Sequence, residues 1–122
     1  MSVLAPISIG ELVDKITILE LKASKTTDAI KLANIQKELR LLNESYNSLH
    51  MDVTALKEEL HKVNSELWDI EDNKRKCEQS QTFDSEFIQL ARSVYIKNDI
   101  RANIKKQINI ITNSGIVEEK IY

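Results

Sequence analysis

Apolar residues recur at alternating intervals of three and four over the middle of the chain, and this spacing defines one continuous stripe. Such a heptad pattern is typical of α-helices that pack along one face, as in coiled coils and helical bundles. The pattern predicts an all-α protein. The stripe comprises Leu32, Ile35, Leu39, Leu42, Tyr46 and Leu49, and it continues in the same phase through Val53, Leu56, Leu60, Val63, Leu67 and Ile70.

The stripe fits either one long helix or a hairpin of two helices. A continuous helix of about 50 residues would be on the order of 75 Å long, and the unbroken phase favours it. A turn near 50–52 is favoured by Asp52, a good N-cap residue, and by Met51 and Leu56, which have the spacing of a hydrophobic staple. We favour the hairpin because a long isolated helix needs a partner along its length, and the single helix is kept as the alternative.

A first helix is predicted over 9–24. Ser8 and Glu11 have the spacing of a capping box, in which the serine hydroxyl accepts a hydrogen bond from the Glu11 amide. The apolar residues of this helix lie on two faces, with Ile16 on one and Ile18 nearly opposite. A helix that is apolar on two sides is usually buried on two sides, so we expect it to lie between other helices.

Turn-forming residues at both ends delimit a last helix over about 84–112. Thr82 or Asp84 is a suitable N-cap at its start, and Gly115 beyond its end is available for the positive φ of a C-cap. The predicted architecture is a helical bundle or coiled-coil hairpin of about four helices with a short C-terminal tail, in one domain over 1–122. The helices are placed at about 9–24, 28–49, 52–79 and 84–112.

Composition supports an α-helical protein of the cytoplasm. The chain has 2 glycines and 1 proline, so it has few residues with which to build the turns of a β-sheet protein. Cys77 is its only cysteine, which fits a reducing compartment. The first residues lack the segments of a signal peptide, and no apolar run approaches the roughly 18 residues of a membrane span. We therefore expect a cytoplasmic protein that does not enter a membrane.

The chain lacks the sequence motifs of common catalytic and metal sites. His50 and His61 do not have the i, i+4 spacing of a metal-binding pair on a helix, and Cys77 has no second cysteine beside it. No phosphate-binding glycine loop or nucleophile elbow occurs. A formal net charge of −2 gives no attraction to nucleic acid. The sequence thus predicts no metal and no cofactor, argues against a nucleic-acid partner, and favours a non-enzymatic role.

Three polar side chains interrupt the apolar face of the last helix. Asn98, Arg101 and Lys105 project within the stripe that the apolar residues of this helix define. An unpaired charge in such a position is costly, so each cation needs a partner. The candidate partners are Glu71 on the preceding helix and Asp14 on the first helix.

This polar cluster supports two interpretations. In the favoured one it is a structural ion-pair network that fixes the register between helices, as polar core residues do in coiled coils. In the other it binds a small molecule that bears phosphate or carboxylate, because arginine binds such groups in bidentate fashion. The ligand-binding residues would then be Glu71, Asn98, Arg101, Lys105, Arg92 and Asp14.

Four motifs resemble a small uncharacterised all-helical family found in bacteria and their phages. They are SIGELVDKITILE at 8–20, LWDIED at 67–72, LARSVYIKNDIR at 90–101 and VEEKIY at 117–122. The resemblance implies a self-contained helical domain, and it brings no activity, cofactor or catalytic residue with it. Some relatives look associated with glycan or cell-surface biosynthesis proteins, which implies by association alone a partner of that kind.

The sequence therefore predicts a non-enzymatic helical interaction or assembly module that forms a homodimer and offers a surface to a protein partner. The alternative is a small-molecule-binding protein or enzyme that uses the polar cluster between the last two helices. The homodimer interface is predicted along the heptad stripe and its flank, at Leu32, Ile35, Leu39, Leu42, Leu56, Leu60, Val63, Leu67, Trp68 and Ile70.

Overall fold

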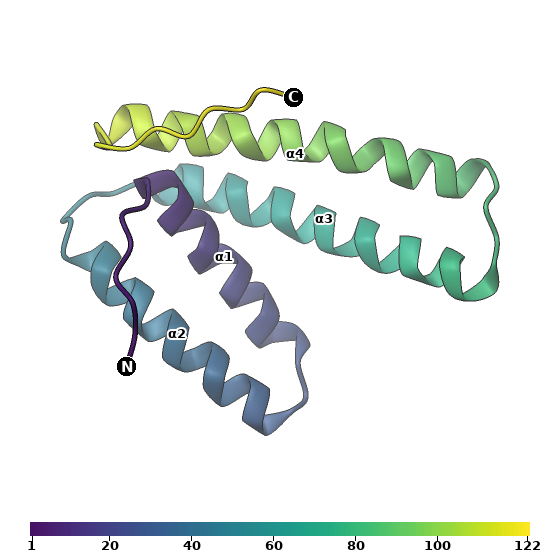
Figure 1. Ribbon diagram of the computed structural model, residues 1–122, viewed down its shortest axis with the longest axis horizontal. Helices are drawn as coiled ribbons and strands as arrows, with labels where there is room; N and C mark the ends of the chain where they lie inside the picture. Colours follow the sequence, from purple (N-terminus) through teal and green to yellow (C-terminus); the bar gives the residue numbers. More distant parts are fainter.

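The computed structural model describes residues 1–122 and consists of four α-helices without a β-strand. The helices are α1 (Ile9–Lys25), α2 (Ala29–Asn47), α3 (Thr54–Ser80) and α4 (Ser85–Ile111). This confirms the all-α prediction, and every helix end lies within two residues of its predicted place. Figure 1 shows two antiparallel pairs, α1 with α2 and α3 with α4, which diverge from one end of the molecule. None of the four helices has the length and hydrophobicity that crossing a membrane requires.

The chain turns between α2 and α3, so the hairpin is confirmed and the single long helix is wrong. His50 takes a positive φ of 52° in this turn, and the Tyr46 hydroxyl donates to the Met51 carbonyl at 3.1 Å. The N-cap position belongs to Val53, not to Asp52 as predicted. The Asp52 carboxylate instead accepts from the Thr54 hydroxyl at 2.6 Å and from the Thr54 amide at 3.0 Å. These two bonds, the first more than the second, lower the pKa of Asp52.

The two halves of the heptad stripe pack onto different neighbours. The helix pairs in contact are α3 with α4 and α1 with each of α2, α3 and α4, whereas α2 and α3 do not pack on each other. The half-buried residues of α2 are its stripe residues together with Asn43, and α1 is the only helix that packs against α2. Helical periodicity therefore identified the packing face of each helix but not its partner.

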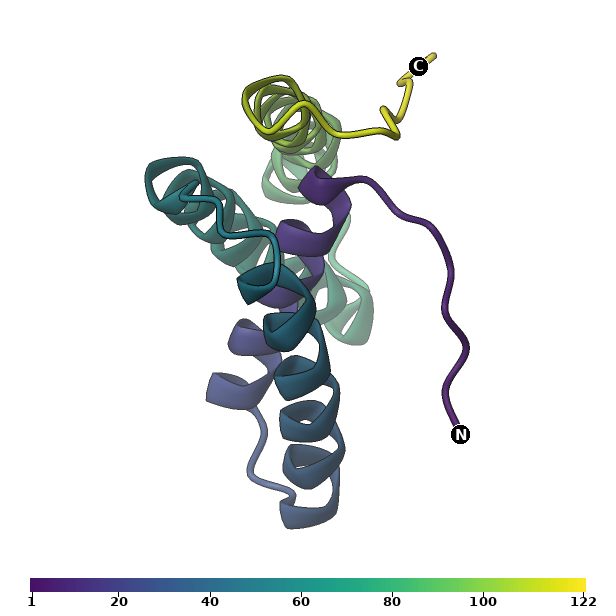
Figure 2. The same ribbon diagram turned by 90° about the vertical axis from the view of Figure 1, so that its left-hand side faces the viewer.

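The central helix is α1, which packs on each of the other three and lies between α4 and α2 in Figure 2. It is buried on two sides, as its two apolar faces predict. α2, in contrast, has no buried residue. The buried residues of α1 are Gly10, Leu12, Val13, Asp14, Ile16, Thr17, Leu19 and Leu21.

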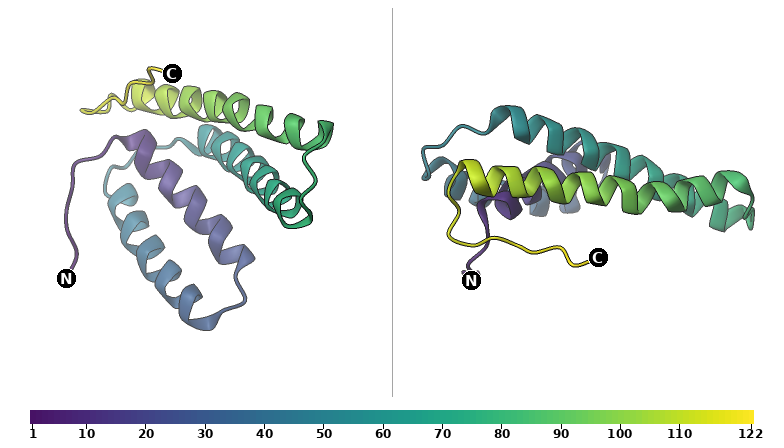
Figure 3. Two further views of the ribbon diagram at one scale, coloured as in Figure 1. Left: turned by 45° about the vertical axis from the view of Figure 1, so that its right-hand side comes forward. Right: turned by 90° about the horizontal axis from the view of Figure 1, so that it is seen from above.

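The hydrophobic core lies at one end of the molecule, where α1 crosses α3 and α4. Between residues 65 and 103 no side chain is buried. Residues 66–97 of the α3–α4 pair, none of which is buried, are called the distal hairpin below. Figure 3 shows that the far end of this pair extends away from α1 and α2. The main core cluster consists of Val13, Val53, Leu60, Val63, Ile104 and Ile108.

The start of α4 is capped as predicted, whereas its end differs from the prediction. Asp84, one of the two N-cap residues predicted, is the N-cap, and its carboxylate accepts from the Glu86 amide at 3.1 Å. At the other end the prediction for Gly115 is wrong, because its φ is not positive. Asn113 takes the left-handed conformation instead, with φ 52°. Asparagine tolerates this region better than most residues with a side chain.

The start of α1 touches α4 so closely that only glycine fits. A Cβ atom on Gly10 would lie 2.5 Å from the Lys105 carbonyl oxygen and 2.9 Å from Asn109 Oδ1. The Gly10 amide uses this proximity to donate to Asn109 Oδ1 at 2.7 Å. The absence of a side chain at residue 10 therefore sets the distance between the two helices.

Replacing Gly10 with alanine should force α1 and α4 apart. We expect the free energy of unfolding, measured in urea, to fall by about 1–3 kcal/mol despite the better helix propensity of alanine. The matched control is Gly115→Ala, since a Cβ there meets nothing within 4 Å. A Gly10→Ala protein as stable as Gly115→Ala would contradict this packing.

Candidate functional site

A buried carboxylate joins α1, α3 and α4 just beyond the core. The Asp14 side chain has 0% exposure and accepts from Arg101 Nε at 3.1 Å and from Asn64 Nδ2 at 2.8 Å. A second bond from the Arg101 guanidinium, through NH2, makes the ion pair bidentate. Thr17 accepts from Asn64 Nδ2 at 2.9 Å and donates to the Asp14 carbonyl at 2.7 Å. Asp14, Thr17, Asn64 and Arg101 are called the polar junction below.

The polar junction stabilises the charged guanidinium of Arg101, which is partly buried. The pKa of Arg101 is raised, first by its hydrogen bonds to Asp14 and then by the negative charges of Asp14, Glu11 and Glu118, against the opposing effect of burial. Bidentate arginine–carboxylate pairs are strong and directional. Their geometry fixes both the spacing and the rotation of α1 against α4 at this point.

Lys105, one helical turn after Arg101, is held by two carboxylates. Its Nζ lies 2.5 Å from Glu11 Oε2 and 3.5 Å from Glu118 Oε1. Glu118 belongs to the C-terminal tail, and it also accepts from the Ser8 hydroxyl at 3.0 Å. Ser8 caps α1 as predicted, by accepting from the Glu11 amide at 3.0 Å. The Glu11 carboxylate, however, pairs with Lys105 and does not complete a capping box.

The N-terminal amides of α1 are all occupied by groups of the protein. The Ile9 amide donates to Ser114 Oγ at 3.2 Å, and the Gly10 amide donates to Asn109 Oδ1. The Glu11 amide donates to Ser8 Oγ. Free amides at a helix start would attract an anion. Here the Ile9 and Gly10 amides bind the start of α1 to the end of α4 instead.

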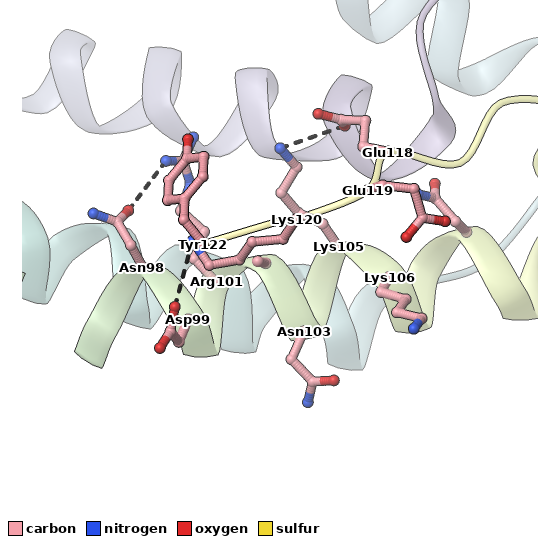
Figure 4. Close-up of a pocket in the computed structure, with 12 residues that line it drawn as sticks. Asn98, Asp99, Arg101, Asn103, Lys105, Lys106, Glu118, Glu119, Lys120 and Tyr122 are labelled. Carbon is pink, nitrogen blue, oxygen red and sulfur yellow. Dashed lines mark hydrogen bonds and ion pairs between the residues drawn. The ribbon is translucent and has the colours of Figure 1, made fainter. Parts of the chain in front are cut away.

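The tail residues 116–122 run along α4 and leave a groove of about 560 Å³ between them. This tail groove is shown in Figure 4, where Lys105 reaches up to Glu118 while Asn103 and Lys106 point away from the tail. Lys120 closes the other end by pairing with Asp99 at 3.4 Å. The cations that line the tail groove near the tail therefore already have acidic partners.

A second groove, of about 480 Å³, opens where α1 and α3 diverge beyond the polar junction. It is called the V groove below. Its wall is formed by apolar residues of α1 and α3 together with polar residues of α3 and α4. The lining residues are Ile18, Leu21, Lys22, Asn64, Leu67, Trp68, Glu71, Arg75, Asn98 and Arg101.

Comparison with known protein families gives one match, which covers residues 3–122. The chain belongs to DUF6165, a family of unknown function. No curated protein matches the chain, and no solved structure does.

The structure brings some of the predicted site residues together and separates others. Of the two acidic partners predicted for the cations of α4, Asp14 is the one that binds Arg101. Glu71 lines the V groove with Asn98 and Arg101, but its ion pair is with Lys74 at 3.6 Å rather than with a cation of α4. Arg92 is exposed and lines neither of the two grooves.

The predicted interface residues pack within the chain in this structure. Those of α2 (Leu32, Ile35, Leu39 and Leu42) are half-buried and face α1. Among those of α3, Leu60 and Val63 belong to the core, while Leu56, Leu67, Trp68 and Ile70 are half-buried.

Sequence reasoning missed the residues that complete the site from a distance. Asn109 and Ser114 bond the start of α1, and Glu118 reaches Lys105 from the tail. Asn109 and Ser114 lie about a hundred residues along the chain from the amides that they bind. In the sequence, these are short polar residues near a helix end. Such residues often bond backbone groups, but the sequence does not show which ones.

Removing the cation of the polar junction should leave Asp14 buried and unpaired. We expect Arg101→Met to lower the free energy of unfolding by about 3–5 kcal/mol. The control is Lys97→Met, which breaks the ion pair between Lys97 and Glu66. Both of these side chains are about one-third exposed, so the free energy of unfolding should fall by less than about 1 kcal/mol. Urea unfolding measures both.

A double variant separates lost charge pairing from lost packing. Asp14→Asn together with Arg101→Met removes both charges, so it should be more stable than Arg101→Met alone. If Arg101→Met costs no more than Lys97→Met, the polar junction does not hold the three helices together.

Proposed function

We propose that this DUF6165 protein is a non-enzymatic helical assembly module that acts as a homodimer. The observation that carries the proposal is the apolar surface that the fold leaves uncovered along α4. Six large apolar residues of this helix have 44–67% of their surface exposed, on the sides that face neither α1 nor α3. They are Ile88, Tyr95, Ile96, Ile100, Ile110 and Ile111. Exposed apolar surface of this extent marks interaction sites in soluble proteins.

The total surface supports a second copy as the partner. The chain exposes 8494 Å², whereas a compact monomer of 14.0 kDa exposes about 6,700 Å². The difference is on the order of 1,800 Å², and the extended terminal segments, in which Leu4 and Tyr122 are more than 90% exposed, contribute part of it. Each partner contributes roughly 800 Å² to a standard interface. Two-fold homodimers are the commonest assemblies, and a net charge of −2 offers little repulsion between copies.

The distal hairpin points to the same conclusion. Two helices alone cannot enclose a core, and accordingly no residue between 65 and 103 is buried. Ile70 and Leu90, which do not line the V groove, are each only half-buried. Pairing with the same element of a second chain would form a four-helix arrangement, in which such residues gain a second layer. The interface proposed here therefore includes α4 rather than the α2 part of the heptad stripe.

The paired charges support a structural role for the polar cluster. Arg101 is neutralised by Asp14, and Lys105 by Glu11 and Glu118. Direct binding of an anion by these two cations, which is the alternative function, would require their present partners to be displaced. We further propose that residues 1–122 act as one domain, in the cytoplasm and without nucleic acid or a membrane. The unpaired Cys77 is consistent with that compartment.

Sedimentation equilibrium over a range of protein concentrations tests the proposal. The wild-type protein should be a dimer or show a monomer–dimer equilibrium. Ile96→Glu combined with Ile100→Glu places two carboxylates in the apolar face of α4, so the variant should be monomeric while its melting temperature, measured in dilute solution, stays close to the wild-type value.

The control is Ile30→Glu on α2, where the side chain is 77% exposed and lies outside the proposed interface. It should dimerise like the wild-type protein. A wild-type chain that is monomeric at every concentration would refute the homodimer, and equal dimerisation of all three proteins would refute the α4 interface.

A further inference from the structure

The V groove is large enough to accept a small molecule. Its volume of about 480 Å³ falls within the range of roughly 300–1,000 Å³ that is typical of ligand pockets. Figure 1 shows its origin, since α1 and α3 separate along their length beyond the polar junction. Ile18 and Leu21 form the side given by α1, and Leu67 and Trp68 form the side given by α3. A ligand in the groove would thus meet apolar surface on two sides.

The V groove contains cations that the protein does not neutralise. Lys22 and Arg75 line the groove, and neither takes part in any of the ion pairs of the structure. The charge of Arg101 at the closed end is balanced by Asp14, and that of Glu71 by Lys74. The groove therefore has a positive excess that comes from Lys22 and Arg75.

The end of the groove next to the polar junction also presents polar groups that make no hydrogen bond within the protein. The Asn64 side chain is buried, with 6% exposure, and both its amide hydrogens are used by Asp14 and Thr17. Its Oδ1 atom accepts no hydrogen bond from the protein, although Asn64 lines the groove. Asn98 accepts from Arg101 NH1 at 3.4 Å and leaves its amide nitrogen free. Asn64 Oδ1 is accessible to solvent rather than enclosed in the core, so a donor group of a ligand in the groove can reach it.

We infer that the V groove binds a small organic anion with an aromatic ring. The ring lies against Trp68, since aromatic faces stack well and the neighbouring side chains are apolar. The anionic group is bound by Lys22 and Arg75 at the open end, where arginine suits phosphate or carboxylate. A donor group on the ring side reaches Asn64 Oδ1. This binding requires neither the homodimer nor the outer face of α4, so either proposal can fail without the other.

Trp68 is the only tryptophan of the chain, so its fluorescence reports on the V groove directly. Phenyl phosphate is the probe, because it combines an aromatic ring with an anionic group. The comparison compounds are inorganic phosphate, which has the anionic group without the ring, and phenol, which has the ring without the phosphate. Titration with phenyl phosphate should give a saturable change in Trp68 fluorescence, with an affinity at least tenfold higher than that of either half.

Variants locate the binding site. Lys22→Ala with Arg75→Ala should weaken phenyl phosphate at least tenfold, and circular dichroism should show an unchanged fold, because both side chains are exposed. Arg92→Ala is the control, since it removes one charge outside the groove and should leave the affinity within twofold.

Several outcomes would overturn the inference. One is a fluorescence change that does not saturate, and another is an equal affinity for phenol or for phosphate alone. A third is an Arg92→Ala variant that weakens binding as much as the double variant does, because binding would then depend on overall charge rather than on the groove.

Discussion

The Asp14 carboxylate, fully buried in the middle of α1, is the constraint on which the rest of the structure depends. A buried carboxylate is tolerated only when it is paired and hydrogen-bonded, so α1 must stay in contact with Arg101 of α4 and Asn64 of α3 at this one level. Gly10 and Asn109 fix a second point of contact between α1 and α4, nearer the start of α1. Two fixed points determine how α1 crosses the α3–α4 pair.

The features of functional interest follow from this crossing. On one side of the polar junction the helices converge and form the core, which includes Leu60 and Ile108. On the other side they diverge, which opens the V groove beside Trp68 and leaves the distal hairpin without a covering layer. The same arrangement explains why few residues are buried, with 17 of 122 in this class. Surface that one chain cannot cover is available to a second copy.

The sequence predicted what depends on local order, namely the four helices, the Ser8 and Asp84 caps and the two-sided burial of α1. It also placed Arg101 among apolar positions and included Asp14 among its partners. It did not predict that α2 packs on α1 alone, because a heptad stripe defines a face but not a neighbour. The stripe keeps its phase across the turn at His50, which made two unrelated packing faces resemble one. The contact of Glu118 with Lys105 was also not predictable, since it joins an extended tail to a helix.

Hydrogen exchange of the backbone amides, followed by mass spectrometry in dilute solution, tests the central role of α1 most directly. Amides exchange slowly where local opening requires disruption of the core. The account predicts the slowest exchange in the middle of α1 around Asp14 and in the parts of α3 and α4 that contact it, near Asn64 and Arg101. It predicts faster exchange in α2 and in the distal hairpin. Exchange in α2 that is as slow as in α1, or faster exchange in α1 than in α2, would contradict it.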